Sequence, residues 1–183
     1  MDKLADGVWR LELKGVNAYL VDDSGTLTLV DAGTPFDAGS IREQVEEAGY
    51  SVSDIDRVLI THYDFDHVGA LPRLELDAPV YAGETDARFL SGESKPPLSN
   101  HKGFFQRLVG VFIGKPDLRI ETVGEGYELG GFTAYTTPGH TPDHTAFVHE
   151  KLGVGFLGDM VAGDDGKLTV LNRLLQYNLG EVH

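Results

Sequence analysis

Two histidines and two aspartates lie within six consecutive residues of the chain, His62-Tyr63-Asp64-Phe65-Asp66-His67. They come just after the run Val58-Leu59-Ile60, whose β-branched and aliphatic residues predict a buried strand. Side chains on a loop at the end of such a strand can converge on one point. Imidazole and carboxylate groups are ligands for borderline and hard divalent cations, so the cluster predicts a metal site. Taken alone, it leaves open a solvated acidic turn with incidental histidines.

Three other segments repeat this arrangement, with a polar side chain at the point where a predicted strand ends. They contain Asp31, His140 and Asp159. His140 lies between Gly139 and Thr141-Pro142, a rigid loop setting that suits a ligand. Asp31 precedes Ala-Gly and either shapes a turn or supports the site, and the two roles are compatible. Three further histidines are expected to do no metal chemistry: His144 is expected to pack or hydrogen-bond, and His101 and His149 to be exposed.

The order and spacing of these segments resemble the metallo-β-lactamase superfamily of metal-dependent hydrolases, from about residue 17 to residue 159. The resemblance implies an α/β (α+β) fold, a four-layer αββα sandwich with the metal site at one edge between two sheets. The family signature His-x-His-x-Asp-His reads here as His-x-Asp-x-Asp-His. Carried over residue by residue, it makes His62 and His140 ligands of a first metal, Asp66 and His67 ligands of a second, Asp159 the bridging carboxylate and Asp31 a support behind the ligands.

The chain departs from the family pattern in two places. Asp64 stands where the family has histidine, and this extra carboxylate can bind metal but makes the site less positive and a weaker Lewis acid. The family also supplies a further histidine after the bridging aspartate, and here only His183 remains. Residues 179–183 are expected to begin a helix that is cut off. Either the chain is truncated, or Asp66, His67 and Asp159 hold the second metal with water, unless the terminus folds back.

The resemblance implies a hydrolase in which a divalent metal activates water and polarises a carbonyl, with Asp66 orienting the water. The expected substrate is a small-molecule thioester, lactone or related ester, in the manner of glyoxalase II. One or two ions per chain are expected, with zinc first and manganese or iron as alternatives suggested by the added carboxylate. The competing hypotheses are a non-hydrolytic iron-binding member of the fold and a metal-binding member without turnover.

Composition limits the other classes of function. The net charge of -14 opposes binding to nucleic acids or anionic membranes, because phosphates would be repelled. The absence of cysteine excludes disulfides and restricts metal ligands to nitrogen and oxygen. No 18 apolar residues run together and the first residues lack a signal-peptide pattern, so a cytoplasmic protein without membrane segments is expected. A homodimer is left open.

Patterning predicts one domain over residues 1–183. Strands are expected at 8–13, 17–22, 26–30, 58–61, 79–82, 119–123, 126–129, 132–137, 144–149 and 153–157, and helices at 37–49, 68–74 and 84–90. Residues 91–116 form an excursion with one helix. Its apolar residues are expected to pack on the core, to form a lid or to make a dimer contact; as a lid, Phe104, Phe105 and Phe112 would line an acyl pocket.

Overall fold

The computed structural model describes residues 1–98, 101–113, 117–164 and 167–170. Two predictions therefore lie outside the described residues, the role of His183 and the start of a helix at 179–183. The side chain of Phe112 also lies outside this part. Within it, no helix has both the length and the apolar character needed to cross a membrane.

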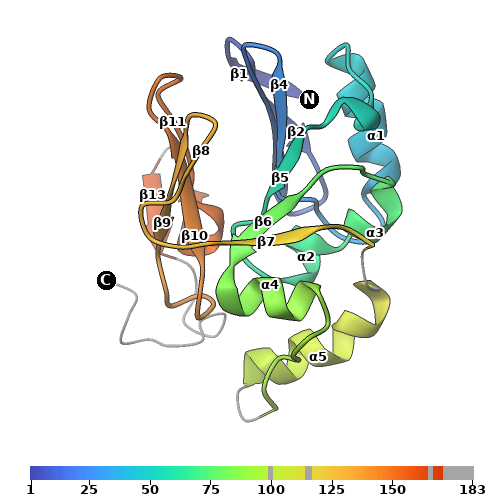
Figure 1. Ribbon diagram of the computed structural model, residues 1–183, viewed down its shortest axis with the longest axis vertical. Coiled ribbons are helices and arrows are strands. Elements are labelled where there is room, and N and C mark those ends of the chain that lie inside the picture. The colour runs from blue at the N-terminus through green and yellow to red at the C-terminus, as the bar shows by residue number, and fades with distance from the viewer. Residues whose placement is uncertain (99–100, 114–116, 165–166, 171–183) are drawn as a thin grey trace.

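A seven-stranded sheet forms the centre of the molecule (Figure 1). Its strands, in spatial order, are β1 (Asp2–Ala5), β2 (Val8–Glu12), β3 (Asn17–Asp23), β4 (Thr26–Val30), β5 (Arg57–Leu59), β6 (Val80–Gly83) and β7 (Ile120–Val123). Pairing is antiparallel from β1 to β4 and parallel from β4 to β7. Because parallel strands end at the same edge, the residues that follow β4 and β5 come together there.

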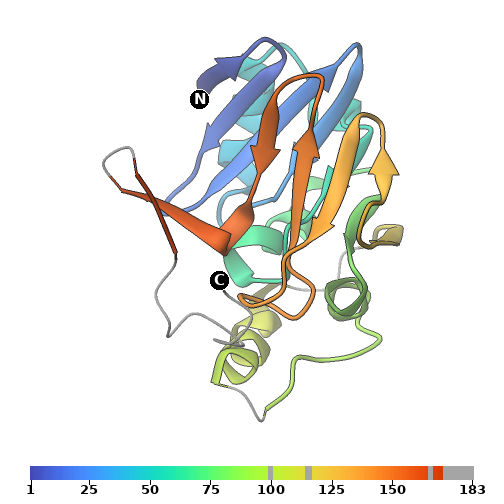
Figure 2. The same ribbon diagram turned by 90° about the vertical axis from the view of Figure 1, so that its left-hand side faces the viewer.

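A second, antiparallel sheet packs against the first and has the order β11-β10-β9-β8. Its strands are β8 (Glu128–Leu129), β9 (Phe132–Thr136), β10 (Thr145–His149) and β11 (Val154–Phe156). A 3-10 turn, η2 (Gly158–Met160), and a hairpin of β12 (Val161–Asp164) and β13 (Lys167–Val170) follow. Figure 2 shows this sheet facing the viewer, with the seven-stranded sheet behind it.

The helices gather around the seven-stranded sheet. They are α1 (Ala38–Glu47), α2 (Phe65–Val68), α3 (Leu71–Leu74), α4 (Glu84–Leu90) and α5 (His101–Ile113), with a 3-10 turn η1 (Val52–Asp54). α1 and α3 cover its outer face, whereas α4 and α5 lie at its lower end in Figure 1. The predicted fold class is confirmed, and the described residues supply a helix layer and two sheets. No described helix covers the outer face of the four-stranded sheet (Figure 2).

Period-two alternation divides the core between the two faces of the central sheet. In β3, Leu20 points to the helix side and Val21 to the second sheet. In β5, Val58 and Leu59 divide in the same way. Burial of both faces explains why these strands read as continuous apolar runs. The core between the sheets is completed by phenylalanines from the second sheet, Phe132, Phe147 and Phe156.

Most predicted elements are present, and the differences have local causes. The helix expected at 68–74 is two short helices, α2 and α3, which together begin earlier, at Phe65. Strand β1 was not predicted, because it lies at a sheet edge, where apolar alternation is not required, and carries the polar residues Asp2 and Lys3. The hairpin of β12 and β13 was likewise not predicted.

Over residues 101–110, helix α5 has the opposite orientation to the one expected from its apolar residues. Phe104, Phe105 and Leu108 are 56%, 59% and 60% exposed, so the prediction that they pack on the core is wrong. Among residues 101–110, the buried side chains are instead Lys102 and Gln106, one turn apart on the same face. Apolar periodicity predicts that the apolar face of a helix packs on the core. It therefore cannot identify a helix that packs through two polar side chains.

Candidate metal centre

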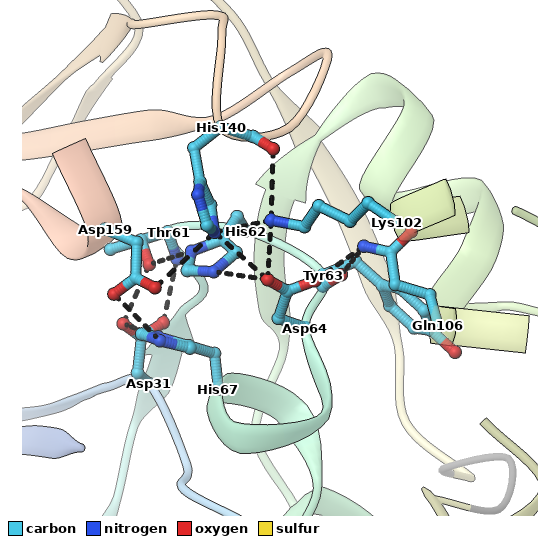
Figure 3. A network of polar contacts seen from close by, with 10 residues as sticks. All are labelled: Asp31, Thr61, His62, Tyr63, Asp64, His67, Lys102, Gln106, His140 and Asp159. Atoms are coloured by element: carbon cyan, nitrogen blue, oxygen red, sulfur yellow. Dashed lines mark hydrogen bonds and ion pairs between the residues drawn. The ribbon is translucent and has the colours of Figure 1, made fainter. Parts of the chain in front are cut away.

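The predicted site residues lie where strands of both sheets end. Asp31 follows β4, His62 follows β5 and Asp159 lies in η2 after β11. Backbone hydrogen bonds fix this junction, since the Asp31 N–H donates to the Leu59 carbonyl at 2.9 Å and the Thr145 N–H to the Thr61 carbonyl at 2.8 Å. The second bond joins the loop after β5 to the four-stranded sheet. Side chains from distant parts of the sequence therefore share one space (Figure 3).

Asp31 anchors one side of the site from a buried position. Its Oδ1 accepts the Thr61 N–H at 2.9 Å, and its Oδ2 accepts the Thr61 hydroxyl at 2.8 Å. The same Oδ2 lies 2.9 Å from Nδ1 of His67. A carboxylate only accepts hydrogen bonds, so Nδ1 of His67 carries a proton and Nε2 faces the site. Asp31 therefore lies behind His67, and the supporting role that the family resemblance implied stays a prediction.

His62 is oriented through the same threonine. Its Nδ1 lies 3.0 Å from the Thr61 hydroxyl, which already donates its one proton to Asp31. The hydroxyl must accept from His62, so Nδ1 is protonated and the lone pair of Nε2 faces the site. Burial and the neighbouring His67 lower the pKa of His62 to about 4. His62 is therefore neutral at pH 7, the form in which imidazole binds metal.

The ligand atoms form two groups that share His62. One contains His62, His67 and Asp159, and the other His62, Asp64 and His140; in each group the atoms lie within 4.8 Å of one another. Asp159 lies between them, with Oδ1 3.4 Å from Nε2 of His67 and Oδ2 3.5 Å from Nε2 of His140. The structure thus brings together five of the six predicted ligands.

The chemistry of this donor set fits a divalent cation. Nε2 of His62 and Nε2 of His67 are buried and have no hydrogen-bond partner of normal geometry among the described residues. Such orphaned nitrogens are costly in a protein interior, and both point toward carboxylates. Nitrogen and carboxylate oxygen atoms converging in this way are the ligands expected for zinc, manganese or iron.

The charges of the site are strongly coupled. Burial alone would raise the pKa of Asp64, but the rings of His140 and His62 hold it well below its usual range. Burial would lower the pKa of His67, but the carboxylates of Asp31 and Asp159 raise it well above its usual value. A protonated His67 thus stabilises the carboxylates of Asp31 and Asp159 without a metal. Metal binding therefore requires the release of a proton from His67.

Asp66 stands apart from both ligand groups. Its side chain is half-buried, and burial, followed by the charges of Asp64 and Asp159, raises the pKa of its carboxyl. The roles of metal ligand and water-orienting group that the resemblance gave to Asp66 stay predictions.

Sequence reasoning missed two side chains of α5 that enter the site. Lys102 is only 8% exposed, and its Nζ lies 2.8 Å from Oδ2 of Asp64 and 2.6 Å from Nε2 of His140. Gln106 donates from Nε2 to Oδ1 of Asp64 at 2.6 Å and to the Tyr63 carbonyl at 2.6 Å. Burial lowers the pKa of Lys102, although the neighbouring Asp64 opposes this. The sequence feature that could have indicated these residues is a lysine and a glutamine four residues apart, on one face of a predicted helix.

A cavity of about 360 Å³ lies behind this contact, between α4 and α5. Its walls include Tyr63, Phe89, Leu90 and Gln106. Phe104 and Phe105 are not among its lining residues, so the prediction that they form the wall of an acyl pocket is wrong for this cavity. Their rings lie on the exposed side of the helix.

The remaining histidines divide between expected and unexpected positions. His101 is exposed as predicted. His144 is buried, its Nδ1 lies 2.7 Å from the Thr137 hydroxyl, and its ring stacks on His62 with centroids 5.0 Å apart. The prediction that His149 is exposed is wrong, because the ring is fully buried and its Nε2 lies 3.2 Å from Oδ2 of Asp23. Its position in the sequence, at the end of a strand, gives no indication of the contact with Asp23, which lies far away in the chain.

Gly158 lets the backbone next to Asp159 approach the site closely. A Cβ atom there would lie 2.7 Å from Nε2 of His144 and 2.7 Å from Oγ1 of Thr61, at φ +49°. We expect Gly158→Ala to lower the free energy of unfolding and to weaken metal binding, because Asp159 must shift. Gly153→Ala is the matched control, since Gly153 has φ +66° and open space around it. Urea denaturation and metal titration of both variants check this; equal effects would contradict it.

Asp86 on α4 is a buried carboxyl outside the ligand groups, and neither of its oxygens makes a hydrogen bond of normal geometry within the described residues. Burial raises its pKa from 3.8 to about 8, opposed in part by the Tyr63 backbone. Between these pH values only the folded chain holds this proton, so the free energy of unfolding falls as pH rises, by at most about 1.4 kcal/mol per pH unit.

The variant Asp86→Asn should remove this contribution and flatten the pH dependence between about pH 5 and pH 7.5. Urea denaturation with chelator present, at both ends of that range, measures the change. Glu84→Gln, at an exposed position of the same helix, is the control and should keep the wild-type slope. A wild-type slope in Asp86→Asn would show that Asp86 does not bind the extra proton.

Comparison with known proteins finds a matching family and several relatives. The sequence profile of the family described as "Metallo-beta-lactamase superfamily" matches residues 11–180. The "Uncharacterized protein YobT" of Bacillus subtilis is 32% identical over 163 residues, covering 83% of this chain and 66% of the relative. The "Probable metallo-hydrolase YqjP" of the same organism is 27% identical over 179 residues, covering 85% and 56%.

Two further matches concern a named activity and a solved structure. "Thioesterase pkgB" of Emericella nidulans is 28% identical over 159 residues, covering 84% of this chain and 38% of the relative. The crystal structure of BJP-1, a subclass B3 metallo-beta-lactamase of Bradyrhizobium japonicum, is 27% identical. It superposes with a TM-score of 0.64 over 91% of this chain and 58% of that one. The chain thus spans about two thirds or less of the length of these relatives.

Proposed function

Because the chain belongs to the metallo-β-lactamase superfamily, we propose that it is a divalent-metal-dependent hydrolase acting on a thioester, lactone or related ester. The observation that carries the proposal is the convergence of two ligand groups on His62, with buried imidazole nitrogens that make no hydrogen bond of normal geometry among the described residues and face carboxylates of the same groups. A hydrogen-bonded core would not leave these nitrogens unsatisfied. A metal site explains these nitrogens and the hydrogen bonds by which Asp31 and Thr61 orient the two rings.

In this proposal His62, His67 and Asp159 hold one metal position, and Asp64 and His140 line a second beside it. A divalent ion bound there would lower the pKa of a bound water and would polarise the carbonyl of the substrate. Asp31 and Thr61 keep the tautomers of the histidines so that each presents Nε2 to the site. Held in this way, the rings of His62 and His67 need little rearrangement when the ion binds.

Asp66 is proposed to orient the attacking water and to take up its proton. Burial raises the pKa of the Asp66 carboxyl, which makes it a stronger base than an exposed aspartate. Asp66 lies in α2, the short helix that follows β5, next to His67. Because this helix also carries His67, a water held by Asp66 stays close to the ligands.

The ester class of substrate is supported by the name of one relative and by the surroundings of the site. The relative from Emericella nidulans is named a thioesterase. The cavity behind Asp64 has apolar walls in Tyr63, Phe89 and Leu90, which suit an acyl chain, and Lys95 and Arg107 also line it. The net charge of -14 also disfavours a nucleic-acid substrate.

A non-hydrolytic iron protein of the same fold is the second candidate. The observation that favours it is Asp64, a hard carboxylate ligand within the group of His62 and His140. Iron as the ion bound after purification, with visible absorbance and no ester cleavage, would favour this candidate over the hydrolase.

The test is hydrolysis of a panel of acyl thioesters, lactones and aryl esters by protein stripped with chelator and then reloaded with Zn²⁺, Mn²⁺ or Fe²⁺. The proposal expects turnover of at least one substrate only after reloading, and its loss on renewed chelation. A His140→Ala variant should lose turnover in parallel. Turnover that persists in chelated protein, or its absence with every metal and substrate, would contradict the proposal.

A further inference from the structure

The ammonium of Lys102 occupies the space between two of the predicted metal ligands. Its Nζ lies 2.8 Å from Oδ2 of Asp64, 2.6 Å from Nε2 of His140 and 3.0 Å from the His140 carbonyl. An ammonium has three N–H donors, and each of these atoms can accept one. The lysine is almost fully buried, so its charge is shielded from water and depends on these partners.

The two ligand atoms themselves are only 3.0 Å apart. When Nε2 of His140 accepts a hydrogen bond from Lys102, it has no proton of its own to donate to Asp64, so Nε2 and Oδ2 face each other as two acceptors. Two acceptors approach this closely when a cation lies between them. Lys102 therefore does for Asp64 and His140 what a metal ion does for its ligands.

Helix α5 holds this cation in place with a second contact. Gln106, one turn after Lys102, donates to Oδ1 of Asp64, so α5 binds both oxygens of one carboxylate (Figure 3). This carboxylate is also the one residue of the signature that replaces the family histidine. A neutral imidazole would offer a lysine no opposite charge, whereas Asp64 does.

We propose that Lys102 competes with a metal ion for Asp64 and His140, so that the two metal positions fill in sequence. The position of His62, His67 and Asp159 fills first, and the position of Asp64 and His140 fills only when Lys102 withdraws. This inference rests on the proposed metal-dependent function, and it makes α5 a regulator of how many ions the site holds. Filling the second position displaces the ammonium and loosens the docking of α5.

The test is a titration of metal-free protein with Zn²⁺ in competition with a chromophoric chelator, for the wild type and for Lys102→Met. The wild type should bind one ion tightly and a second more weakly. In Lys102→Met the weaker affinity should rise about 10- to 100-fold, the range expected when a metal no longer breaks a charge-assisted hydrogen bond. The tighter affinity should stay unchanged.

Two further variants separate charge from packing. Lys102→Arg keeps a cation and should retain a weak second position, and Lys14→Met removes an exposed lysine and should behave as the wild type. Circular dichroism checks that each variant is folded, and Lys102→Gln replaces Lys102→Met if the latter is not.

The outcomes distinguish this inference from the proposed function. Two equal affinities in the wild type, or an unchanged weaker affinity in Lys102→Met, would overturn the competition while leaving metal-dependent hydrolysis standing. If neither wild type nor variant binds Zn²⁺, both the inference and the proposed function fail. Unequal affinities that become similar only without the lysine charge support the competition.

Discussion

Replacing Asp159 by alanine is expected to abolish metal-dependent hydrolysis while leaving the fold largely intact. Its two carboxylate oxygens face Nε2 of His67 and Nε2 of His140, so the variant removes the group placed between both ligand sets. Metal catalysis contributes several kcal/mol of transition-state stabilisation, so turnover should fall by about 10³-fold or more. The side chain lies at the surface end of the site, 30% exposed, and contributes little to the core.

Turnover of a responsive substrate and the number of bound ions are measured on the same preparation of Asp159→Ala. Asp77→Ala is the control, since Asp77 is an exposed aspartate outside the ligand groups. The control should keep both the turnover and the metal of the wild type. Unchanged turnover in Asp159→Ala would contradict the proposed metal site.

Replacing Asp31 by alanine is expected to reduce both stability and metal affinity. The variant leaves His67 and the Thr61 hydroxyl without their buried acceptor. Breaking a buried charge pair costs about 3–5 kcal/mol of unfolding free energy. Loss of a residue that orients a ligand lowers metal affinity by about 10- to 100-fold. Urea denaturation of metal-free protein and a Zn²⁺ titration measure the two effects separately.

Two further variants show whether the backbone or the carboxylate is responsible. Asp31 has φ 58°, in the left-handed region, which asparagine also tolerates. Asp31→Asn therefore keeps the turn and should still lose metal affinity. Glu75→Ala is the matched control, because Glu75 is exposed and also has φ 58°. If Glu75→Ala costs as much stability as Asp31→Ala, backbone strain and not the carboxylate explains the effect.

The parts of the fold set by local pattern could be predicted from the sequence. Val58 and Leu59 lie in a strand buried on both faces, and an apolar run predicts this directly. The family resemblance placed the polar residues after β4 and β5 in one site, and the structure shows that these two strands are parallel and end at one edge. The family resemblance then added His140 and Asp159, which pattern alone could not join to them.

The parts that failed depend on contacts between residues distant in sequence. His149 is buried because Asp23 meets it across the sheets, and nothing near His149 in the chain indicates that partner. Helix α5 docks through Lys102 and Gln106 because Asp64 is there to receive them. A hydrophobic pattern predicts the reverse orientation, because it takes no account of a buried charge pair such as Lys102 and Asp64.

The most direct test of the metal centre is elemental analysis of protein purified without chelator, giving the identity and number of bound ions per chain. We expect one or two divalent ions, zinc first, with the position of His62, His67 and Asp159 occupied before the other. Protein that holds no metal, even after reconstitution with Zn²⁺, Mn²⁺ or Fe²⁺, would contradict the metal-dependent hydrolase.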